Sequence, residues 1–455
     1  MNPETLLANA QCIQAEIAWF REFLEQRLLL HAEEKSNGDL LAELPPPALV
    51  ESQSPYAETI QRFEMGAAER LVLILALIPH VKPGTLDPFF IQNQSVQRRF
   101  TEFGGLLGMA HGGFLPTAET AMFLLAGDNI HIRLKYHHLF HHEHFLYAHQ
   151  ILSLDHRHQE EPPLSSALRM TPVYLERLIT GGTYHPPLSQ EFPAQLITTP
   201  YGWEDLVLET GTRQEIDDIV TWITHQDTLL NEWQLRDRLK AGFRSLFYGP
   251  PGTGKTLTAS LLGKATGLPV YRVDLSKVVS KYIGETEKNL ASLFDHAQHQ
   301  NWILFFDEAD SLFGKRTESR NANDRAANQQ ISYLLQRIED FPGIAILATN
   351  MRFHLDEAFA RRFQSVVHFP MPGHHQRLQL WEDNFKNKPY PLAADVNFSR
   401  LAREYELSGG SIINVLRYAC LKAVVRTPPM IHSQDLLSGI SRELHKEGKS
   451  LQHQH

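Results

Sequence analysis

The chain has 455 residues, which is enough for two to four domains. A hydrophobic content of 42% and a charged content of 21% are ordinary for a globular protein, while 52 acidic against 43 basic residues argue against broad binding to nucleic acid or anionic membranes. Two cysteines exclude a disulfide framework and favour a reducing, cytoplasmic location. No signal-peptide pattern is evident at the start, and the longest apolar run, Leu71 to Ile78, is too short to cross a bilayer.

The N-terminal region, residues 1–185, is predicted to be mostly helical. Apolar residues recur at helical spacing from Thr5 to Leu30, which predicts an amphipathic helix or helix pair. Three prolines at 45–47 interrupt the pattern, and helices are expected again over 56–63 and 67–78.

The second half of this region favours a winged-helix-like unit. Thr117 is placed to cap a helix that ends near Gly127. The strict alternation of apolar and polar residues from Ile130 to Tyr136 then predicts a half-buried strand. No single helix carries a cluster of Arg and Lys, so we expect the unit to dock a protein rather than DNA.

Seven histidines crowd residues 131–149. The pairs His137/His141 and His138/His142 have the spacing of two ligands on one helical face, as a zinc site requires. A solvated, histidine-rich segment is the favoured interpretation, because no cysteine lies nearby and no second ligand pair matches.

A proline-rich linker is expected over 186–201, followed by an α/β domain over 202–371 and a small helical lid over 372–455. The α/β domain is organised around a glycine-rich turn between the apolar run 244–248 and a helix that begins with Leu257. Backbone N–H groups of such a turn, together with the helix N-terminus, cradle phosphates. The turn is Gly249-Pro250-Pro251-Gly252-Thr253-Gly254-Lys255-Thr256, in which Lys255 is placed to reach the phosphates and Thr256 to ligate Mg²⁺.

Two further strands end in residues suited to ATP chemistry. The apolar strand 302–306 delivers Asp307, a candidate Mg²⁺ ligand, and Glu308, a candidate base for the attacking water. The strand 344–349 ends in Asn350, which is placed to contact the γ-phosphate or the water. Other strands are expected over 270–275 and 366–370. Arg361 and Arg362 follow a short helix, and either one is a candidate to reach the γ-phosphate held by a neighbouring subunit.

Residues 202 to about 425 resemble an AAA+ ATPase of the AAA clade, which includes katanin-like and valosin-containing-protein-like proteins. The resemblance depends on three motifs, Gly-Pro-Pro-Gly-Thr-Gly-Lys-Thr at 249–256, Phe-Phe-Asp-Glu-Ala-Asp at 305–310 and Ala-Thr-Asn at 348–350. It implies a P-loop ASCE sheet, ATP and Mg²⁺ as ligands, and a homo-oligomer, with a hexamer expected, acting on protein. The clade separates its two arginines by Pro-Gly, whereas Arg361 and Arg362 are adjacent, so the sequence leaves open which of them acts.

The resemblance also assigns two further sites. It places Lys281, Tyr282, Ile283 and Gly284 in the central pore of a ring, with Tyr282 gripping an extended polypeptide. The same role is favoured without the family, because a flat amphipathic ring contacts a peptide of any sequence, and a core or lid aromatic is the less favoured alternative for Tyr282. The polar stretch 314–321 is equally compatible with a second pore loop or a plain solvated loop. In the lid, the resemblance places Gly409 and Gly410 against the adenosine, and Arg417 is a weaker candidate for a phosphate contact.

We therefore expect an ATP-driven ring motor that remodels, unfolds or threads proteins. The single-module layout also resembles bacterial ATPases found with contractile injection systems. Two alternatives stay open from the sequence: a nucleic-acid motor or loader, and an assembly scaffold that hydrolyses ATP slowly.

Overall fold

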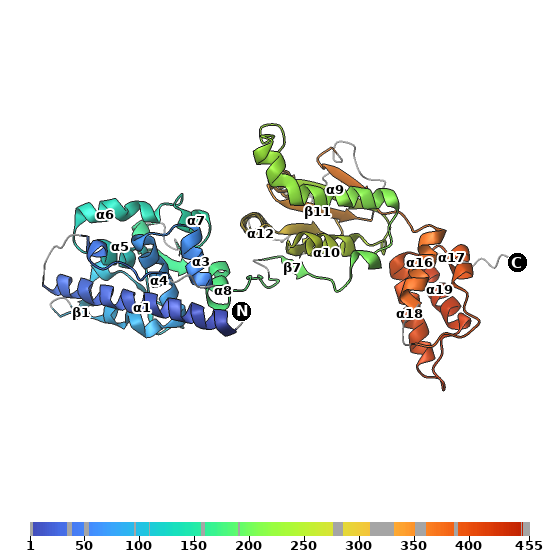
Figure 1. The fold of residues 1–455 in the computed structure, drawn as a ribbon, viewed down its shortest axis with the longest axis horizontal. Coiled ribbons are helices and arrows are strands. Elements are labelled where there is room, and N and C mark those ends of the chain that lie inside the picture. Colours follow the sequence, from blue (N-terminus) through green and yellow to red (C-terminus); the bar gives the residue numbers. More distant parts are fainter. Residues whose placement is uncertain are drawn as a thin grey trace, which may run out of the picture. The chain divides into compact units, whose positions relative to one another are not determined.

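The computed structural model describes residues 3–33, 39–49, 54–94, 97–108, 110–155, 160–189, 192–275, 285–309, 332–350, 361–385, 390–446 and 448. The chain divides into two compact units, residues 1–185 and 186–455 (Figure 1).

The first unit is mainly helical, with three short antiparallel strand pairs. Its helices are α1 (Pro3–Ala32), α2 (Leu40–Glu43), α3 (Pro55–Arg62), α4 (Ala67–Val81), η1 (Pro83–Phe90), η2 (Thr101–Phe103), α5 (Ala118–Ala126), α6 (Ile130–Tyr136), η3 (His137–Phe140), α7 (Phe145–Ala148), η4 (Pro163–Ser165) and α8 (Pro172–Thr180). The paired strands are β1 (Gln92–Asn93) with β2 (Arg98–Arg99), β3 (Leu106–Leu107) with β4 (Phe114–Leu115), and β5 (Leu152–Asp155) with β6 (Ala167–Met170).

Helix α4 lies at the centre of this unit. Its residues from Leu71 to Ile78 are all buried, and they pack into one core with α1, α3 and α5. The helix expected over 67–78 is confirmed, and the longest apolar run of the sequence lies in the core. Among the described residues no single helix is long and apolar enough to cross a membrane, and α4 passes such a test only together with η1, at a bend of 105°.

The predicted helix start at Thr117 is confirmed. The Thr117 hydroxyl accepts a hydrogen bond from the Thr120 backbone N–H, and the Thr120 side chain accepts one from the Thr117 N–H. This reciprocal pair satisfies two donors that a helix start leaves without partners. Helix α5 then ends at Gly127, as expected.

The strand predicted for residues 130–136 is wrong, because they form helix α6. The Asn129 side chain accepts a hydrogen bond from the Ile132 N–H and so caps the helix. Ile132 and Tyr136, four residues apart, face the core, whereas Ile130 and Leu134 are 73% and 70% exposed. An alternating sequence thus supplies two apolar helical faces, only one of which is buried. The winged-helix expectation rested on this strand and stays a prediction.

The second unit is built on a six-stranded sheet with the order β12-β8-β11-β10-β9-β7. The strands are β7 (Ala194–Ile197), β8 (Phe243–Tyr248), β9 (Val270–Val273), β10 (Ile303–Phe306), β11 (Ile344–Thr349) and β12 (Ser365–His368). All neighbouring pairs are parallel except β7 with β9. The α/β fold and all five strands expected from the sequence are confirmed.

Strand β7 lies within the stretch that the sequence predicts to be a linker. Residues Ala194 to Ile197 pair with Val273 to Val270 and close one edge of the sheet. Prolines and a lack of periodicity mark the segment as irregular, but an antiparallel edge strand of four residues needs neither a long alternating pattern nor burial on both faces.

Helices cover both faces of the sheet. They include η5 (Trp203–Asp205), α9 (Thr210–Asp227), the π-helical turn η6 (Thr228–Glu232), α10 (Lys255–Thr266) and α12 (Glu285–Gln300). One face packs Phe247, Phe305 and Ile346 against α9 and α10, and the other packs Leu304 and Phe306 against α12. Burial on both faces explains the continuous apolar runs of β10 and β11.

The C-terminal part of this unit is helical, with α16 (His374–Phe385), α17 (Phe398–Glu404), α18 (Gly409–Ala423) and α19 (Ser433–Lys446) (Figure 1). Trp381, Phe385, Ile412, Leu436 and Ile440 fill a core of their own between these helices. The helical lid expected from the sequence therefore has its own hydrophobic core.

Candidate functional site

The glycine-rich turn follows β8 and leads into α10, as predicted. Gly249, Gly252 and Gly254 all have positive φ, at 148°, 77° and 105°. A side chain at Gly249 would meet the Phe369 backbone oxygen at 2.0 Å, and one at Gly252 would meet the Ser408 hydroxyl at 2.5 Å. The turn therefore requires glycine for backbone conformation and for space.

Lys255 is the first residue of α10 and is buried beneath this turn. Its Nζ donates hydrogen bonds to the backbone oxygens of Gly249 at 2.6 Å and Pro250 at 2.9 Å, and to Asn350 Oδ1 at 2.9 Å. The ammonium thus lies inside the loop that surrounds it, where phosphate oxygens are suitable alternative acceptors.

The parallel pairing of β8, β11 and β10 brings the predicted polar residues to one edge of the sheet. The Thr256 hydroxyl donates to Asp307 Oδ2 at 3.2 Å, and Asn350 follows β11 next to Lys255. The tip of β11 therefore lies beside that of β10. Thr256 and Asp307 form a pair of hard oxygen donors of the kind that Mg²⁺ accepts, directly or through water.

Glu308 has an unusual backbone conformation, with φ of 51°. Its N–H donates to Asp307 Oδ1 at 3.0 Å, and the following Ala309 N–H donates to the Ala348 oxygen of β11 at 2.8 Å. A left-handed conformation at a residue with a side chain costs free energy and persists where neighbouring bonds enforce it. It leaves the Glu308 carboxylate exposed at the cavity.

The lid contributes to the same site through the start of α18. The Ser408 hydroxyl caps this helix by accepting from the Ser411 N–H at 3.2 Å. The Gly410 N–H donates to the Gly252 oxygen at 3.0 Å, so the lid is bonded directly to the glycine-rich turn. Gly409 and Gly410 therefore lie beside the glycine-rich turn, whereas their contact with an adenosine stays a prediction.

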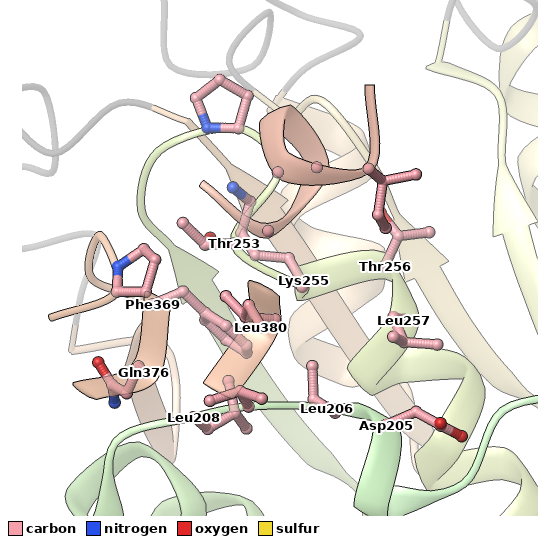
Figure 2. Close-up of a pocket in the computed structure, with 18 of the residues that line it drawn as sticks. Asp205, Leu206, Leu208, Thr253, Lys255, Thr256, Leu257, Phe369, Gln376 and Leu380 are labelled. Atoms are coloured by element: carbon pink, nitrogen blue, oxygen red, sulfur yellow. The ribbon is translucent and has the colours of Figure 1, made fainter. Parts of the chain in front are cut away.

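Together these elements enclose a cavity of about 570 Å³ (Figure 2). One side is polar, with Lys255, Thr256, Asp307, Glu308 and Asn350. The other side is largely apolar, and Figure 2 shows its labelled members around the same space. That side consists of Leu206, Val207, Leu208, Phe369, Pro370, Pro372, Leu380, Ile413 and Leu416, with Gln376, Asp383, Asn384 and Tyr390 nearby.

The apolar side is the part of the site that motif analysis missed. Leu206 to Leu208 precede α9, and Leu380 and Asn384 belong to α16, so no short motif unites them. A signal was present in the sequence, since an apolar run at 206–208 stands directly before the amphipathic helix 210–227. Only the fold shows that both segments border the glycine-rich turn.

The shape and polarity of the cavity fit a nucleoside triphosphate. A volume in this range is typical of small-molecule sites, and an apolar side next to a cationic one suits a base next to phosphates. A side chain at Gly252 would meet Ser408 at 2.5 Å and one at Gly254 would meet Leu206 at 2.8 Å, so glycine lets the residues that border the cavity pack closely against the turn. Thr256 and Asp307 are the residues suited to hold Mg²⁺.

The two arginines lie outside this cavity. Arg362 forms an ion pair with Glu339, whose backbone oxygen also accepts from Arg244 Nη1 at 2.6 Å. Arg244 is buried, and the loss of water around its guanidinium lowers the pKa of that group. Neither Arg361 nor Arg362 lines the site of their own subunit, and Arg417 lies away from it as well, facing a separate groove of the lid.

Several predicted residues cannot be located. Lys281, Tyr282, Ile283, Gly284 and the stretch 314–321 lie outside the described residues. Within the described ranges no three His, Cys, Asp or Glu side chains are arranged to hold a metal ion, in the histidine-rich segment or elsewhere.

Comparisons with known proteins agree with this geometry. The family described as "ATPase family associated with various cellular activities (AAA)" matches residues 245–371. An uncharacterized AAA family ATPase of Sinorhizobium fredii is 32% identical over 260 residues, which cover 55% of this chain and 76% of that protein.

Two relatives have more informative names. Human vacuolar protein sorting-associated protein 4A is 33% identical over 192 residues, which cover 41% of this chain and 44% of that protein. The proteasome-activating nucleotidase of Methanosarcina mazei is 33% identical over 205 residues, covering 43% and 48%. The chain therefore matches less than half the length of these two proteins.

Proposed function

Because the chain belongs to the AAA family of ATPases, we propose that it uses ATP hydrolysis in a ring of identical subunits to remodel, unfold or thread protein substrates. The observation that carries the proposal is the single cavity where the glycine-rich turn, the ends of β10 and β11 and the start of α18 meet. ATP binding and hydrolysis are properties of the family. The use of Mg²⁺, the assignment of each residue and the protein substrate are our proposals.

Each polar residue has a role that follows from its position. When ATP binds, Lys255 Nζ gives up its hydrogen bonds to the carbonyl oxygens of Gly249 and Pro250 and donates to phosphate oxygens instead. The ammonium then neutralises part of the phosphate charge. Thr256 and Asp307 hold Mg²⁺, which when bound offsets charge on the β- and γ-phosphates. Asn350 lies within 2.9 Å of Lys255 Nζ and so keeps the lysine directed at the γ-phosphate position.

Glu308 is the proposed general base. Its carboxylate orients the attacking water and accepts a proton as the new P–O bond forms and the bond to the ADP oxygen breaks. The rigid turn around its backbone holds the carboxylate at the cavity before any substrate binds. Preorganised groups of this kind need no rearrangement during the reaction.

A complete site requires a second subunit. The described residues of one chain place no arginine along the cavity, whereas transition-state charge on a transferred phosphoryl group is commonly stabilised by one. Arg361 or Arg362 of a neighbouring copy would supply it. The pairing of Arg362 with Glu339 holds this segment next to β8, at a fixed place in its own subunit.

The lid connects hydrolysis to movement. The Gly410 N–H bond to the Gly252 oxygen links α18 to the turn that binds phosphates. A change in that turn between ATP and ADP therefore changes the position of the lid helices, and motion is passed to the neighbour. Tyr282, by resemblance to the family, would grip an extended polypeptide through its flat ring, without demanding a particular sequence.

Two measurements test whether the motor acts on protein. An unfolded protein such as casein should raise the ATPase rate, and DNA should not. A Tyr282→Ala variant should keep its basal ATPase rate and lose both the stimulation by casein and any remodelling. Stimulation by DNA alone would instead support a nucleic-acid motor. A Glu308→Gln variant with no turnover and full biological activity would support a scaffold.

Two finer expectations from the sequence stay predictions. These are a role with a contractile injection system and a location in the cytoplasm.

A further inference from the structure

A second hollow of the lid lies between α18 and α19. It has a volume of about 360 Å³ and does not share the described lining of the nucleotide cavity. Four of the eight residues that line it are cationic and one is acidic. The lining residues are Asn414, Arg417, Tyr418, Leu421, Lys422, Arg442, Glu443 and Lys446, and we call this feature the lid groove.

The one acidic side chain of the lid groove is already occupied. Glu443 is only 9% exposed, accepts a hydrogen bond from Asn414 Nδ2 at 3.2 Å and forms an ion pair with Lys446. In the described part of the chain, no carboxylate forms an ion pair with Arg417, Lys422 or Arg442. The lid groove therefore keeps an excess of positive charge on a chain whose net charge is −9.

Tyr418 arranges two of these cations. Lys422 Nζ lies 5.6 Å from the centre of its ring, and Arg442 Cζ lies 4.9 Å from it. Attraction to the ring face holds both long side chains beside the groove and lowers the entropy that each would lose on binding an anion.

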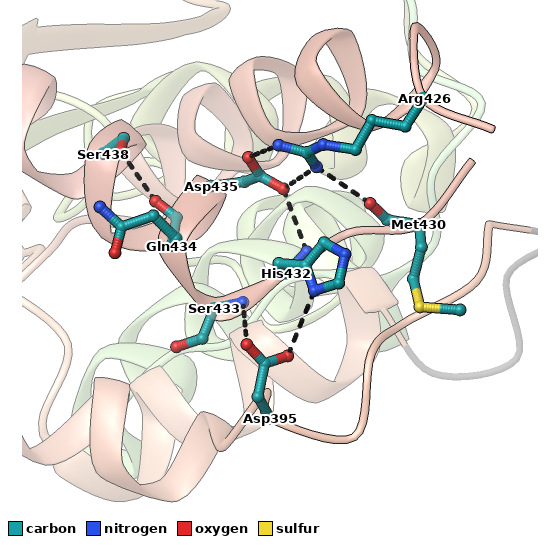
Figure 3. A network of polar contacts seen from close by, with 8 residues as sticks. All are labelled: Asp395, Arg426, Met430, His432, Ser433, Gln434, Asp435 and Ser438. Carbon is teal, nitrogen blue, oxygen red and sulfur yellow. Dashed lines mark hydrogen bonds and ion pairs between the residues drawn. The ribbon is translucent and has the colours of Figure 1, made fainter. Parts of the chain in front are cut away.

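The walls of the lid groove are held at a fixed separation. Figure 3 shows the network that closes the connection between α18 and α19. Arg426 binds both carboxylate oxygens of Asp435 and the Met430 oxygen, and the His432 N–H donates to Asp435 Oδ2 at 3.0 Å. Gly439 of α19 lies directly against Val415 of α18, where a side chain would meet it at 3.0 Å.

An exposed apolar surface continues from the lid groove. Leu421 is 63% exposed, and Val424 and Val425 at the end of α18 are 67% and 79% exposed. Leu421 lines the lid groove, and the two valines follow it directly after α18 ends at Ala423, so we call these three exposed residues the shelf. Exposed aliphatic side chains beside unpaired cations are typical of a surface that meets a partner.

We propose that the lid groove binds an acidic segment of a partner protein, with an apolar side chain next to its carboxylates. Charge complementarity supports this occupant, because carboxylates would pair with Arg417, Lys422 and Arg442 while the apolar side chain covers Leu421 and the valines. A nucleic acid fits less well. It offers no aliphatic group for the shelf, and the two cations beside Tyr418 already cover the ring on which a base would stack.

The position of α18 gives this docking a consequence for the motor. The same helix carries Gly410, Ile413 and Leu416 at the nucleotide cavity and Arg417, Tyr418 and Leu421 at the lid groove. A partner that fixes the helix would therefore change nucleotide affinity, and nucleotide would change the affinity for the partner by the same factor. This coupling rests on the proposed function, whereas docking itself is measurable without nucleotide.

The test uses the full-length protein and a short fluorescein-labelled peptide of Asp-Glu-Leu repeats, measured by fluorescence anisotropy without nucleotide. Arg442→Glu and Arg417→Glu should each weaken binding by about tenfold or more, since each loses a charge-assisted contact and adds repulsion. Arg403→Glu on α17 is the matched control, with the same change of charge in the same lid, outside the groove. It should bind the peptide as the unchanged protein does.

Further arms separate the alternatives. Replacing Leu by Ser in the peptide should weaken binding, and raising the salt concentration should weaken it as well. Absence of peptide binding, equal loss in Arg403→Glu, or tighter binding of a single-stranded oligonucleotide of equal charge would each overturn the proposal. Loss of peptide binding to the Glu308→Gln protein that appears with ATP only at protein concentrations where the protein assembles would also overturn it, because a neighbouring copy would then cover the groove. Peptide binding without any effect of ATP on its affinity would remove only the coupling.

Discussion

The contact between the lid and the glycine-rich turn requires glycine at position 410. The Gly410 N–H donates to the Gly252 oxygen at 3.0 Å, and a methyl group at Gly410 would lie 3.1 Å from the Gly252 Cα. Gly252 has φ of 77° and sits against Ser408, so it has little freedom to move away. In Gly410→Ala the turn and the lid must therefore separate by a few tenths of an ångström.

Two opposing effects determine how far Gly410→Ala changes the stability of the lid and the affinity for ATP. Alanine stabilises a helix by about 0.5–1 kcal/mol relative to glycine, so the lid should gain or keep stability. Overpacking costs about 1–3 kcal/mol, and the backbone hydrogen bond is worth about 0.5–1.5 kcal/mol. The cost applies to the closed arrangement that binds nucleotide. A loss of about 1.4 kcal/mol of binding free energy raises the Kd for ATP about tenfold, and a larger loss raises it further.

Gly409→Ala is the matched control, one residue earlier on the same helix. A side chain there would have its nearest neighbours at 3.5 and 3.7 Å, which is ordinary contact. We expect its Kd for ATP to stay within about twofold. Calorimetric titration with ATP, with unfolding followed in parallel, measures both properties. Equal affinities for the two variants would refute the proposed contact, as would a Gly410→Ala protein that binds ATP normally.

Three other predictions concern the glycine-rich turn, the lid and the N-terminal unit. Lys255→Met should remove the stabilisation that saturating ATP gives, about 2.7 kcal/mol at a hundredfold excess over Kd, and an unchanged rise in Tm would count against the assigned role. Arg426 lowers the pKa of Asp435, so this pair stabilises the fold at neutral pH and the stabilisation is lost as the pH falls below about 4. Asp435→Asn should accordingly cost about 2 kcal/mol at pH 7, with the difference shrinking in acid, and a difference independent of pH would contradict the ion pair. Thr117→Ala should destabilise the N-terminal unit by about 1 kcal/mol in thermal unfolding, since it removes a helix cap.

The sequence predicts the polar half of the site well because phosphate chemistry constrains short, contiguous segments. A turn that must expose backbone N–H groups needs glycine at fixed positions, and acids must stand at the end of an apolar strand. Such constraints are local, so the sequence alone singles out Lys255, Asp307 and Asn350. The predicted catalytic roles of Glu308 and the arginines stay predictions.

The apolar half of the site could not be predicted in this way. Leu206, Leu380 and Ile413 come from three distant segments, and any apolar residue of suitable size serves there, so no motif records them. The same limit explains the wrong strand at 130–136. Alternation and helical periodicity share the spacing of four residues, and the cap at Asn129 together with tertiary burial of Ile132 and Tyr136 decides between them.

The central claim is that each ATP site is completed by an arginine of a neighbouring copy, and mixing two inactive proteins tests it most directly. One protein carries Glu308→Gln with both arginines intact, and the other carries Arg361→Ala and Arg362→Ala with Glu308 intact. Phosphate release is measured for each alone and for the mixture. We predict that each protein alone is nearly inactive and that the mixture recovers part of the activity of the unaltered protein. A mixture without recovery, or an arginine variant as active as the unaltered protein, would contradict the account.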